Sequence, residues 1–184
     1  LQGALAEAAA APLLLDDLLG PLLRFGLLTR DPGARTVGLH LLVQEVIRGG
    51  LDEAAQRAWA ERLVSALALI FPEVDYATQA RCSRLLTHAL VCAGWIARWD
   101  LRSAAAGRLL WRLGHQLLEQ SQPAEAEPLL TRALAICEEL GLRDSMVEVL
   151  NLLGWLHHGA GRLAAADPLY RRALALAEQG GDAE

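Results

Sequence analysis

The fold follows from two stretches of sequence: LLWRLGHQLLEQSQPAEAEPLLTRALAICEEL at residues 109–140 and VLNLLGWLHHGAGRLAAADPLYRRALALAEQG at residues 149–180. They align without a gap at a period of 40 residues, which places Pro128 over Pro168. The run RALA at residues 132–135 recurs at 172–175 in the same register. A fixed period of this length indicates stacked repeats, in which each unit buries its apolar face against the next.

Each copy predicts a pair of helices, because apolar residues recur three and four positions apart. The turn inside each copy is expected near residues 121–123 and near residues 159–161. The second copy is expected to open at a capping box, in which Ser145 and Glu148 satisfy each other's free N–H groups. Small residues are predicted where the two helices approach closely, and Leu130 and Tyr170 are predicted to fill the remaining space. The small positions are Gly114, Ala126, Ala133 and their counterparts Gly154, Ala166, Ala173.

The large and small positions of both copies resemble the tetratricopeptide signature. The first copy follows it at Leu110, Leu113, Gly114, Leu117, Ala126, Leu130 and Ala133. The second copy follows it at the same offsets, except that His157 stands at a position that is usually aromatic. The segments AEAEPLLTRALAI and AAADPLYRRALAL resemble the kinesin-light-chain-like variety. The resemblance implies a solenoid of antiparallel helical hairpins over residues 101–184, with repeats at about 107–140 and 147–180.

A weaker copy is predicted upstream, over residues 51–100. Residues 84–90, RLLTHAL, resemble residues 128–134, PLLTRAL, at an offset of 44 residues. They would form the second helix of a degenerate hairpin whose first helix is residues 52–70. Phe71 and Pro72 end that first helix.

Residues 1–50 have a different sequence pattern from the repeats. A short helix is predicted at residues 16–25, followed by two apolar runs at 26–30 and 35–40 around the turn Asp31-Pro32-Gly33-Ala34, which predicts a β-hairpin. A further helix at residues 41–48 is expected to stop at Gly49-Gly50. Helix, hairpin and helix in this order predict the end of a winged-helix domain. The fold class is therefore mainly α, with a small hairpin near the N-terminus.

The phrase LLRFGLLTRD…TVGLHLLVQEVIR resembles the winged-helix region of NB-ARC or STAND-type signalling ATPases that carry tetratricopeptide arms. In that family a Met-His-Asp-like motif begins the helix after the wing, and its His contacts the ADP phosphate in the resting state. His40 matches, whereas Leu39 and Leu41 replace the Met and the Asp. The resemblance implies a nucleotide-sensing role for His40 in a parent protein that binds ATP or ADP. The alternative is that His40 hydrogen-bonds backbone at a strand-to-helix corner.

The composition of the chain argues against several classes of function. The net charge is −5, which argues against a nucleic-acid partner because phosphate binding requires a basic face. No residue is Lys, so a Walker A lysine or a Schiff-base lysine is excluded within the chain. No apolar run reaches the length of a membrane span. We expect a cytoplasmic, bacterial piece of a larger protein, because residues 1–10 include no initiator Met and the chain ends in a linker-like EQGGDAE.

Neither a metal site nor an enzyme is expected. Cys82, Cys92 and Cys137 lie among apolar helix residues and predict buried free thiols. His88 and Cys92 share a helix face, but Cys82 points away, so three converging zinc ligands are not expected. No GxSxG, HExxH or Gly-rich phosphate loop occurs. We therefore predict no catalytic residue and no cofactor in this segment.

The resemblance implies that the first helix of each repeat lines an inner groove that binds a protein or peptide. Trp and Arg are enriched where partners are anchored, although each residue could equally serve helix packing. The residues placed on this face are Arg108, Trp111, Arg112, His115 and Glu119 in the first copy and Glu148, Asn151, Trp155 and His158 in the second.

Three functions remain open. The leading hypothesis is a non-catalytic regulatory and recognition segment of a STAND-like signalling ATPase. A winged-helix transcription regulator with a repeat effector domain is a second, but the helix at residues 16–25 begins with two acids and offers only Arg24. A plain scaffold, with the front segment as a cap, is the third. An exposed end of the solenoid could also pair with a second copy of the chain.

Overall fold

A computed structural model describes residues 12–33 and 36–181. The chain divides between Gln56 and Arg57 into two compact units. Both are built mainly from helices, and the first unit also contains a two-stranded antiparallel hairpin. The two units are described separately.

The first unit has the predicted order of helix, hairpin and helix. Its elements are α2 (Pro12–Arg24), β1 (Leu28–Asp31), β2 (Thr36–Leu39) and α3 (Leu41–Gly50). The strands pair antiparallel, with Leu28 opposite Leu39 and Asp31 opposite Thr36. The predicted helix at residues 16–25 is therefore found with an earlier start, and the hairpin is confirmed. Part of its turn, residues 34–35, lies outside the described residues.

The predicted stop of α3 at Gly49-Gly50 is confirmed, because the helix ends at Gly50. Gly49 and Gly50 are both helical, and the chain leaves the helix at Leu51, whose N–H donates to the carbonyl of Arg48. Neither glycine adopts a left-handed conformation, so the helix ends at this pair without a left-handed glycine cap. Among its described side chains α3 has no buried residue.

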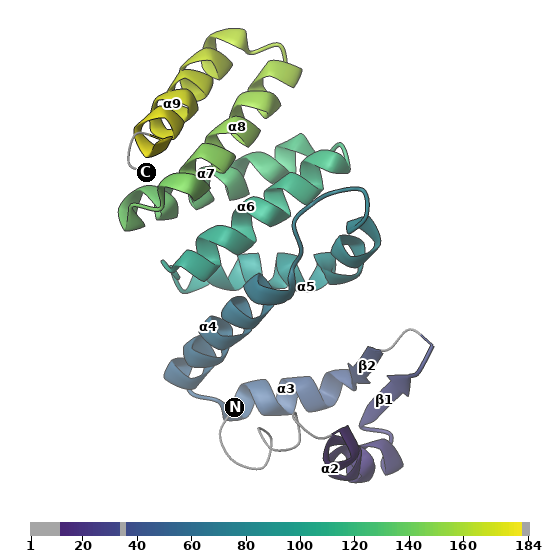
Figure 1. Ribbon diagram of the computed structural model, residues 1–184. Coiled ribbons are helices and arrows are strands. Elements are labelled where there is room, and N and C mark those ends of the chain that lie inside the picture. The colour runs from purple at the N-terminus through teal and green to yellow at the C-terminus, as the bar shows by residue number, and fades with distance from the viewer. Residues whose placement is uncertain (1–11, 34–35, 182–184) are drawn as a thin grey trace. The chain divides into compact units, whose positions relative to one another are not determined.

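The second unit is an array of helices in which α6 and α7, and then α8 and α9, pair as hairpins (Figure 1). The helices pack mainly against their neighbours in sequence, as stacked repeats do, with the strongest contacts inside the pairs α6·α7 and α8·α9. The turns between α6 and α7 and between α8 and α9 fall where the repeat alignment predicted them. The helices are α4 (Glu53–Ile70), α5 (Gln79–Arg98), α6 (Ala104–Glu119), α7 (Pro123–Leu140), α8 (Arg143–Gly159) and α9 (Leu163–Gly181).

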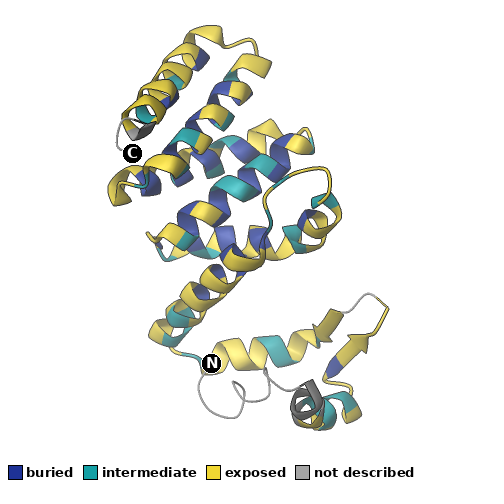
Figure 2. Ribbon diagram, in the orientation of Figure 1, coloured by how far each residue is buried: buried dark blue, intermediate teal, exposed yellow. Residues whose placement is uncertain are grey.

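One continuous apolar core runs from α4 to α8, and its buried residues lie on the facing sides of the helices (Figure 2). The predicted close approach is present at Gly114, where an added Cβ would lie 2.7 Å from both Cγ and Cδ2 of Leu130. The same holds in the second repeat, where a Cβ on Gly154 would lie 2.7 Å from the ring of Tyr170. A larger residue at Gly114 would clash with the fully buried Leu130, whereas one at Gly154 would displace the ring of Tyr170, which is 38% exposed.

The start of α8 corrects the sequence prediction. The helix begins at Arg143 with Leu142 as its N-cap, and no side chain caps it. Ser145 and Glu148 lie inside the helix and form no capping box. The preceding helix is capped by Gly141, whose φ of 65° turns the chain sharply, so the N-cap of α8 lies three residues earlier than its cap-like sequence indicates.

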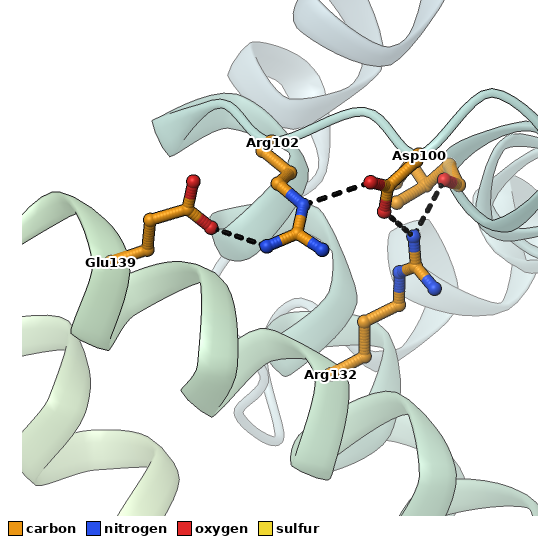
Figure 3. Close-up of polar contacts among 5 residues, drawn as sticks. Asp100, Arg102, Arg132 and Glu139 are labelled. Atoms are coloured by element: carbon orange, nitrogen blue, oxygen red, sulfur yellow. Dashed lines mark hydrogen bonds and ion pairs between the residues drawn. The ribbon is translucent and has the colours of Figure 1, made fainter.

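Ion pairs connect successive hairpins along the outer helices. Arg132 on α7 donates to the carbonyl of Ile96 at 3.0 Å and to Asp100 at 2.8 Å (Figure 3). Asp100 also accepts from Arg102, which reaches Glu139 on α7 at 2.6 Å. The end of α5 is thereby tied to α7. Forty residues on from Arg132, Arg172 on α9 pairs with Glu138 on α7, so the arginine at this repeat position again links successive second helices, through a different partner.

Candidate partner-binding face

The inner face of the array is formed by α6 and α8, the first helices of the two repeats, which contact each other. On α6, Arg108, Arg112, His115 and Glu119 recur at intervals of four, three and four residues. They therefore share one side of the helix. This stripe contains most of the residues predicted on the first copy. Its members differ in what they contact.

Arg112 is engaged within the chain. Its Nη1 donates to the carbonyl oxygen of Phe71 at 2.7 Å, and its Nη2 lies 3.4 Å from Glu73. Phe71 is fully buried, so the connection between α4 and α5 is held against α6 at this point (Figure 1). Burial lowers the pKa of Arg112 below its ordinary value, and the carboxylate of Glu73 opposes that change. The guanidinium of Arg112 is thus a structural link in this state.

Trp111 belongs to the packing of the array. Its partly buried ring packs against the apolar core, and its buried Nε1 has no hydrogen-bond partner among the described residues. The guanidinium of Arg112 lies 5.4 Å from the centre of the Trp111 ring. The repeat period places Asn151 at the corresponding position of α8, where it is exposed.

His115 lies between the two inner helices. Its Nε2 is 3.8 Å from Oε1 of Glu119 on its own helix. Burial lowers the pKa of His115 below its ordinary value, while the carboxylates of Glu119 and of Glu148 on α8 both act to raise it. Because burial is the largest effect, the imidazole is neutral at neutral pH. The two carboxylates lie close enough to influence the same ring.

A hollow of about 340 Å³ opens where the second inner helix ends beside the turn between α6 and α7. Trp155 borders it, with 48% of the residue exposed. Leu118 and Leu156 at its wall are buried, so the hollow has an apolar lining backed by the core. The complete lining is Leu118, Ser121, Pro123, Trp155, Leu156, Gly159 and Ala160.

Sequence reasoning placed Trp155 on this face and missed the other lining residues. The alignment located the turns at residues 121–123 and 159–161, and these turns supply much of the lining. Combining the turns with Trp155 could have indicated the hollow. Arg108, Asn151 and His158 are exposed as predicted for a partner face. None of the three forms an ion pair with another described residue.

A larger hollow of about 430 Å³ lies against the hairpin of the first unit. Its lining comes from β1, β2 and the turn that joins them, including Pro32 and Val37. The turn passes through residues 34–35, which are outside the described part of the chain. We therefore place the candidate site on the repeats.

His40 stands at the corner between β2 and α3 as the N-cap of α3. Its Nδ1 accepts a hydrogen bond from the N–H of Leu42 at 3.2 Å, and His40 is exposed. A side-chain acceptor at this position satisfies one of the free N–H groups of the first helical turn. The backbone contact expected in the alternative reading of His40 is therefore present.

The three cysteines are free and buried, as the sequence predicted. Burial raises the pKa of the Cys92 thiol to about 11 and raises that of Cys137 as well. Within residues 12–33 and 36–181, no three His, Cys, Asp or Glu side chains are grouped so that they could hold a metal ion. None of the helices described is both long enough and apolar enough to cross a membrane.

Comparison with known proteins supports the repeat assignment. No curated protein and no solved structure is significantly similar to the chain. The family model described as the tetratricopeptide repeat matches residues 106–179. These residues span α6 to α9, whose period, hairpin geometry and small-residue contacts are given above. Residues 106–179 are therefore tetratricopeptide repeats.

Proposed function

We propose that α6 to α9 bind a protein or peptide through the inner face of α6 and α8. Tetratricopeptide repeats generally mediate protein–protein interaction. The observation that carries the proposal is the half-exposed Trp155 beside the apolar hollow. A large aromatic ring next to a preformed hollow can bury much apolar area while losing little side-chain entropy, and this is the usual character of a binding anchor.

The internal contacts of α6 define where the partner would lie. Arg112 and Trp111 are engaged with Phe71 and with the core, so the α4 side of α6 is occupied by the chain itself. The side towards α8 presents Trp155, Asn151 and the hollow. The bound segment is therefore expected along α8 rather than along α4. Binding of a partner, rather than catalysis, is the role we propose for this face.

The test is a selection of peptides from a random 12-residue display library on the immobilised chain. Selected peptides are then synthesised with a fluorophore, and their dissociation constants are measured by anisotropy. Trp155→Ala is expected to weaken binding at least tenfold, because a buried anchor typically contributes more than 1.4 kcal/mol. Trp59→Ala is the matched control, since Trp59 on α4 is 42% exposed and does not line the hollow.

Two results would contradict the proposal. One is a selection that enriches no peptide above the background of the uncoated surface. The other is equal affinity of the selected peptides for the chain and for Trp155→Ala, with circular dichroism showing that both are folded. Loss of binding in Trp59→Ala but not in Trp155→Ala would move the site to α4.

We further propose that the chain serves as the regulatory arm of a STAND-type signalling ATPase. The order of helix, hairpin and helix in residues 12–50, followed by repeats, supports it. The exposed His40 at the start of α3 also supports it, because its ring would be accessible to a nucleotide. ATP or ADP would be held by another domain of the parent protein, and partner binding would shift that protein between its two states.

A pair of substitutions separates the two roles of His40. In the full-length protein, His40→Ser keeps a side-chain acceptor at the N-cap, whereas His40→Ala removes both the cap and the imidazole. A nucleotide-sensing role predicts faster ADP release in both variants. A purely capping role predicts normal release in His40→Ser. The ATPase proposal fails outright if the full-length protein binds no nucleotide.

A further inference from the structure

Among the described residues, two carboxylates on the proposed binding face have no arginine partner. The ion pair that Glu119 forms there is with His115, which is neutral at neutral pH because burial lowers its pKa. Glu148 is exposed, and within the described part of the chain no ion pair includes it. By contrast, Glu127, Glu138 and Glu139 of the outer helix α7 are each paired with an arginine of a neighbouring hairpin or turn. Glu119 and Glu148 differ from these three because the described residues place no arginine against them.

These carboxylates lie outside the lining of the apolar hollow but within a short distance of it along α6 and α8. Glu119 follows Leu118, which forms part of the hollow wall. Glu148 and Trp155 share one side of α8, seven residues apart, which corresponds to about 10 Å along the helix. An extended peptide covers this distance in about three residues, at roughly 3.3 Å each. One short segment can therefore reach both the hollow and the carboxylates.

The same face offers little to an acidic partner. The guanidinium of Arg112 is already hydrogen-bonded to the Phe71 carbonyl and faces Glu73. Arg108 stands eleven residues before Glu119 on α6, about 16 Å away along the helix axis. An acidic group seated at the hollow would approach Glu119, and like charges at such distances repel.

We propose that the partner is an extended, basic peptide segment. A large apolar side chain would occupy the hollow beside Trp155, and a Lys or Arg within about three residues of it would pair with Glu119 or Glu148. This assignment rests on the proposed function of the face and adds the chemistry of its ligand. The Lys or Arg supplies the charge that the two carboxylates lack.

The display selection described above provides the first readout. Peptides enriched on the chain are expected to carry an apolar anchor with an excess of Lys and Arg over Asp and Glu within three positions of it. Selection on Glu119→Gln/Glu148→Gln should lose the basic excess and keep the apolar anchor. Selection on Trp155→Ala should lose the anchor.

The second readout is affinity. Each exposed ion pair is worth about two- to fivefold in the dissociation constant, so the double variant should bind the selected basic peptides roughly four- to twenty-fivefold more weakly. Raising NaCl from about 50 mM to about 500 mM should weaken binding to the chain and leave the double variant nearly unchanged. Glu53→Gln/Glu178→Gln removes the same charge from exposed positions on α4 and α9 and should bind as the chain does.

The outcomes separate the two proposals. Absence of any Trp155-dependent peptide overturns the binding function itself. Peptides that depend on Trp155 but carry no basic excess, or an acidic one, leave that function intact and overturn the basic-peptide assignment. Equal affinity of the chain and Glu119→Gln/Glu148→Gln for the selected peptides also overturns it.

Discussion

The contact between Gly114 and Leu130 allows a stability prediction with an internal reference. In Gly114→Ala the new Cβ would lie 2.7 Å from Leu130 Cγ and Cδ2, whereas carbon atoms in contact normally lie about 3.5–4.0 Å apart. Leu130 is fully buried, so it cannot move out towards solvent. Overpacking of this kind costs about 1–3 kcal/mol, and alanine returns up to about 1 kcal/mol of helix propensity.

Gly94→Ala on α5 should gain the same helix propensity as Gly114→Ala without a steric clash of the new Cβ. Nothing lies within 4 Å of the position of its added Cβ, so this variant should be more stable than the chain by about 0.5–1 kcal/mol. The difference between the two alanine variants isolates the close approach. We expect Gly114→Ala to be about 2–3 kcal/mol less stable than Gly94→Ala, because the neighbour is fully buried. With an m-value of about 2 kcal/mol per molar, their urea midpoints differ by at least about 1 M.

The assay is urea unfolding followed by circular dichroism, with a double-mutant cycle. Leu130→Ala alone should destabilise the array by about 2–5 kcal/mol, since it leaves a cavity. In that background Gly114→Ala should cost nothing, because its new methyl group enters the cavity. The reasoning is refuted if Gly114→Ala is as stable as Gly94→Ala, or if its penalty persists when Leu130 is absent.

Three further predictions concern the contacts between helices and the buried thiols. Arg112→Ala should lower the free energy of unfolding by about 1.5–3 kcal/mol through loss of the charged hydrogen bond to the Phe71 carbonyl. Arg108→Ala should change the free energy of unfolding by less than about 0.5 kcal/mol. Urea unfolding of both variants tests this contrast. The hydrogen bond from Arg102, helped by Arg132, lowers the pKa of Asp100 below its ordinary value of 3.8, so this carboxylate stabilises the fold above that pH and ceases to do so as the pH falls through the lowered pKa. Asp100→Asn should therefore flatten the acid dependence of the unfolding free energy, measured between about pH 5 and pH 2; an unchanged slope would count against the ion-pair network. Because all three cysteines are buried, a thiol reagent at about pH 8 should label none of them rapidly in the folded chain and all of them in urea, and fast native labelling would contradict their burial. Burial also raises the pKa of Cys92 to about 11, which slows its reaction further.

Local sequence rules accounted for most of the helices and failed at the start of α8. The expected capping box at Ser145 was wrong, since α8 starts at Arg143, whereas the expected stop of α3 at Gly49-Gly50 was confirmed. Such sequence signals indicate which residues are compatible with a helix end. Where the end occurs depends on how the neighbouring segment turns, as at Gly141 before α8.

The inner face was predictable in outline and not in detail. The helical period placed Arg112, His115 and Trp155 on one side of the first helices, and the structure retains that placement. Their environments differ because the connection after α4 contacts only one of them. Phe71 contacts Arg112 from forty-one residues upstream, and no local pattern indicates such a contact.

The sequence by itself determined the repeat, because period, small positions and large positions are local properties that recur 40 residues apart. It likewise determined the hairpin near the N-terminus, because two short apolar runs around a Pro-Gly turn have few other stable arrangements. Only the tertiary structure decided which inner residues remain open. The guanidinium of Arg112 donates a hydrogen bond to the carbonyl of Phe71, which is distant in sequence. Trp155 stays half exposed beside a hollow that is lined by residues of two different turns. Exposure depends on what the rest of the chain places against a residue, and that is settled when segments far apart in sequence pack together.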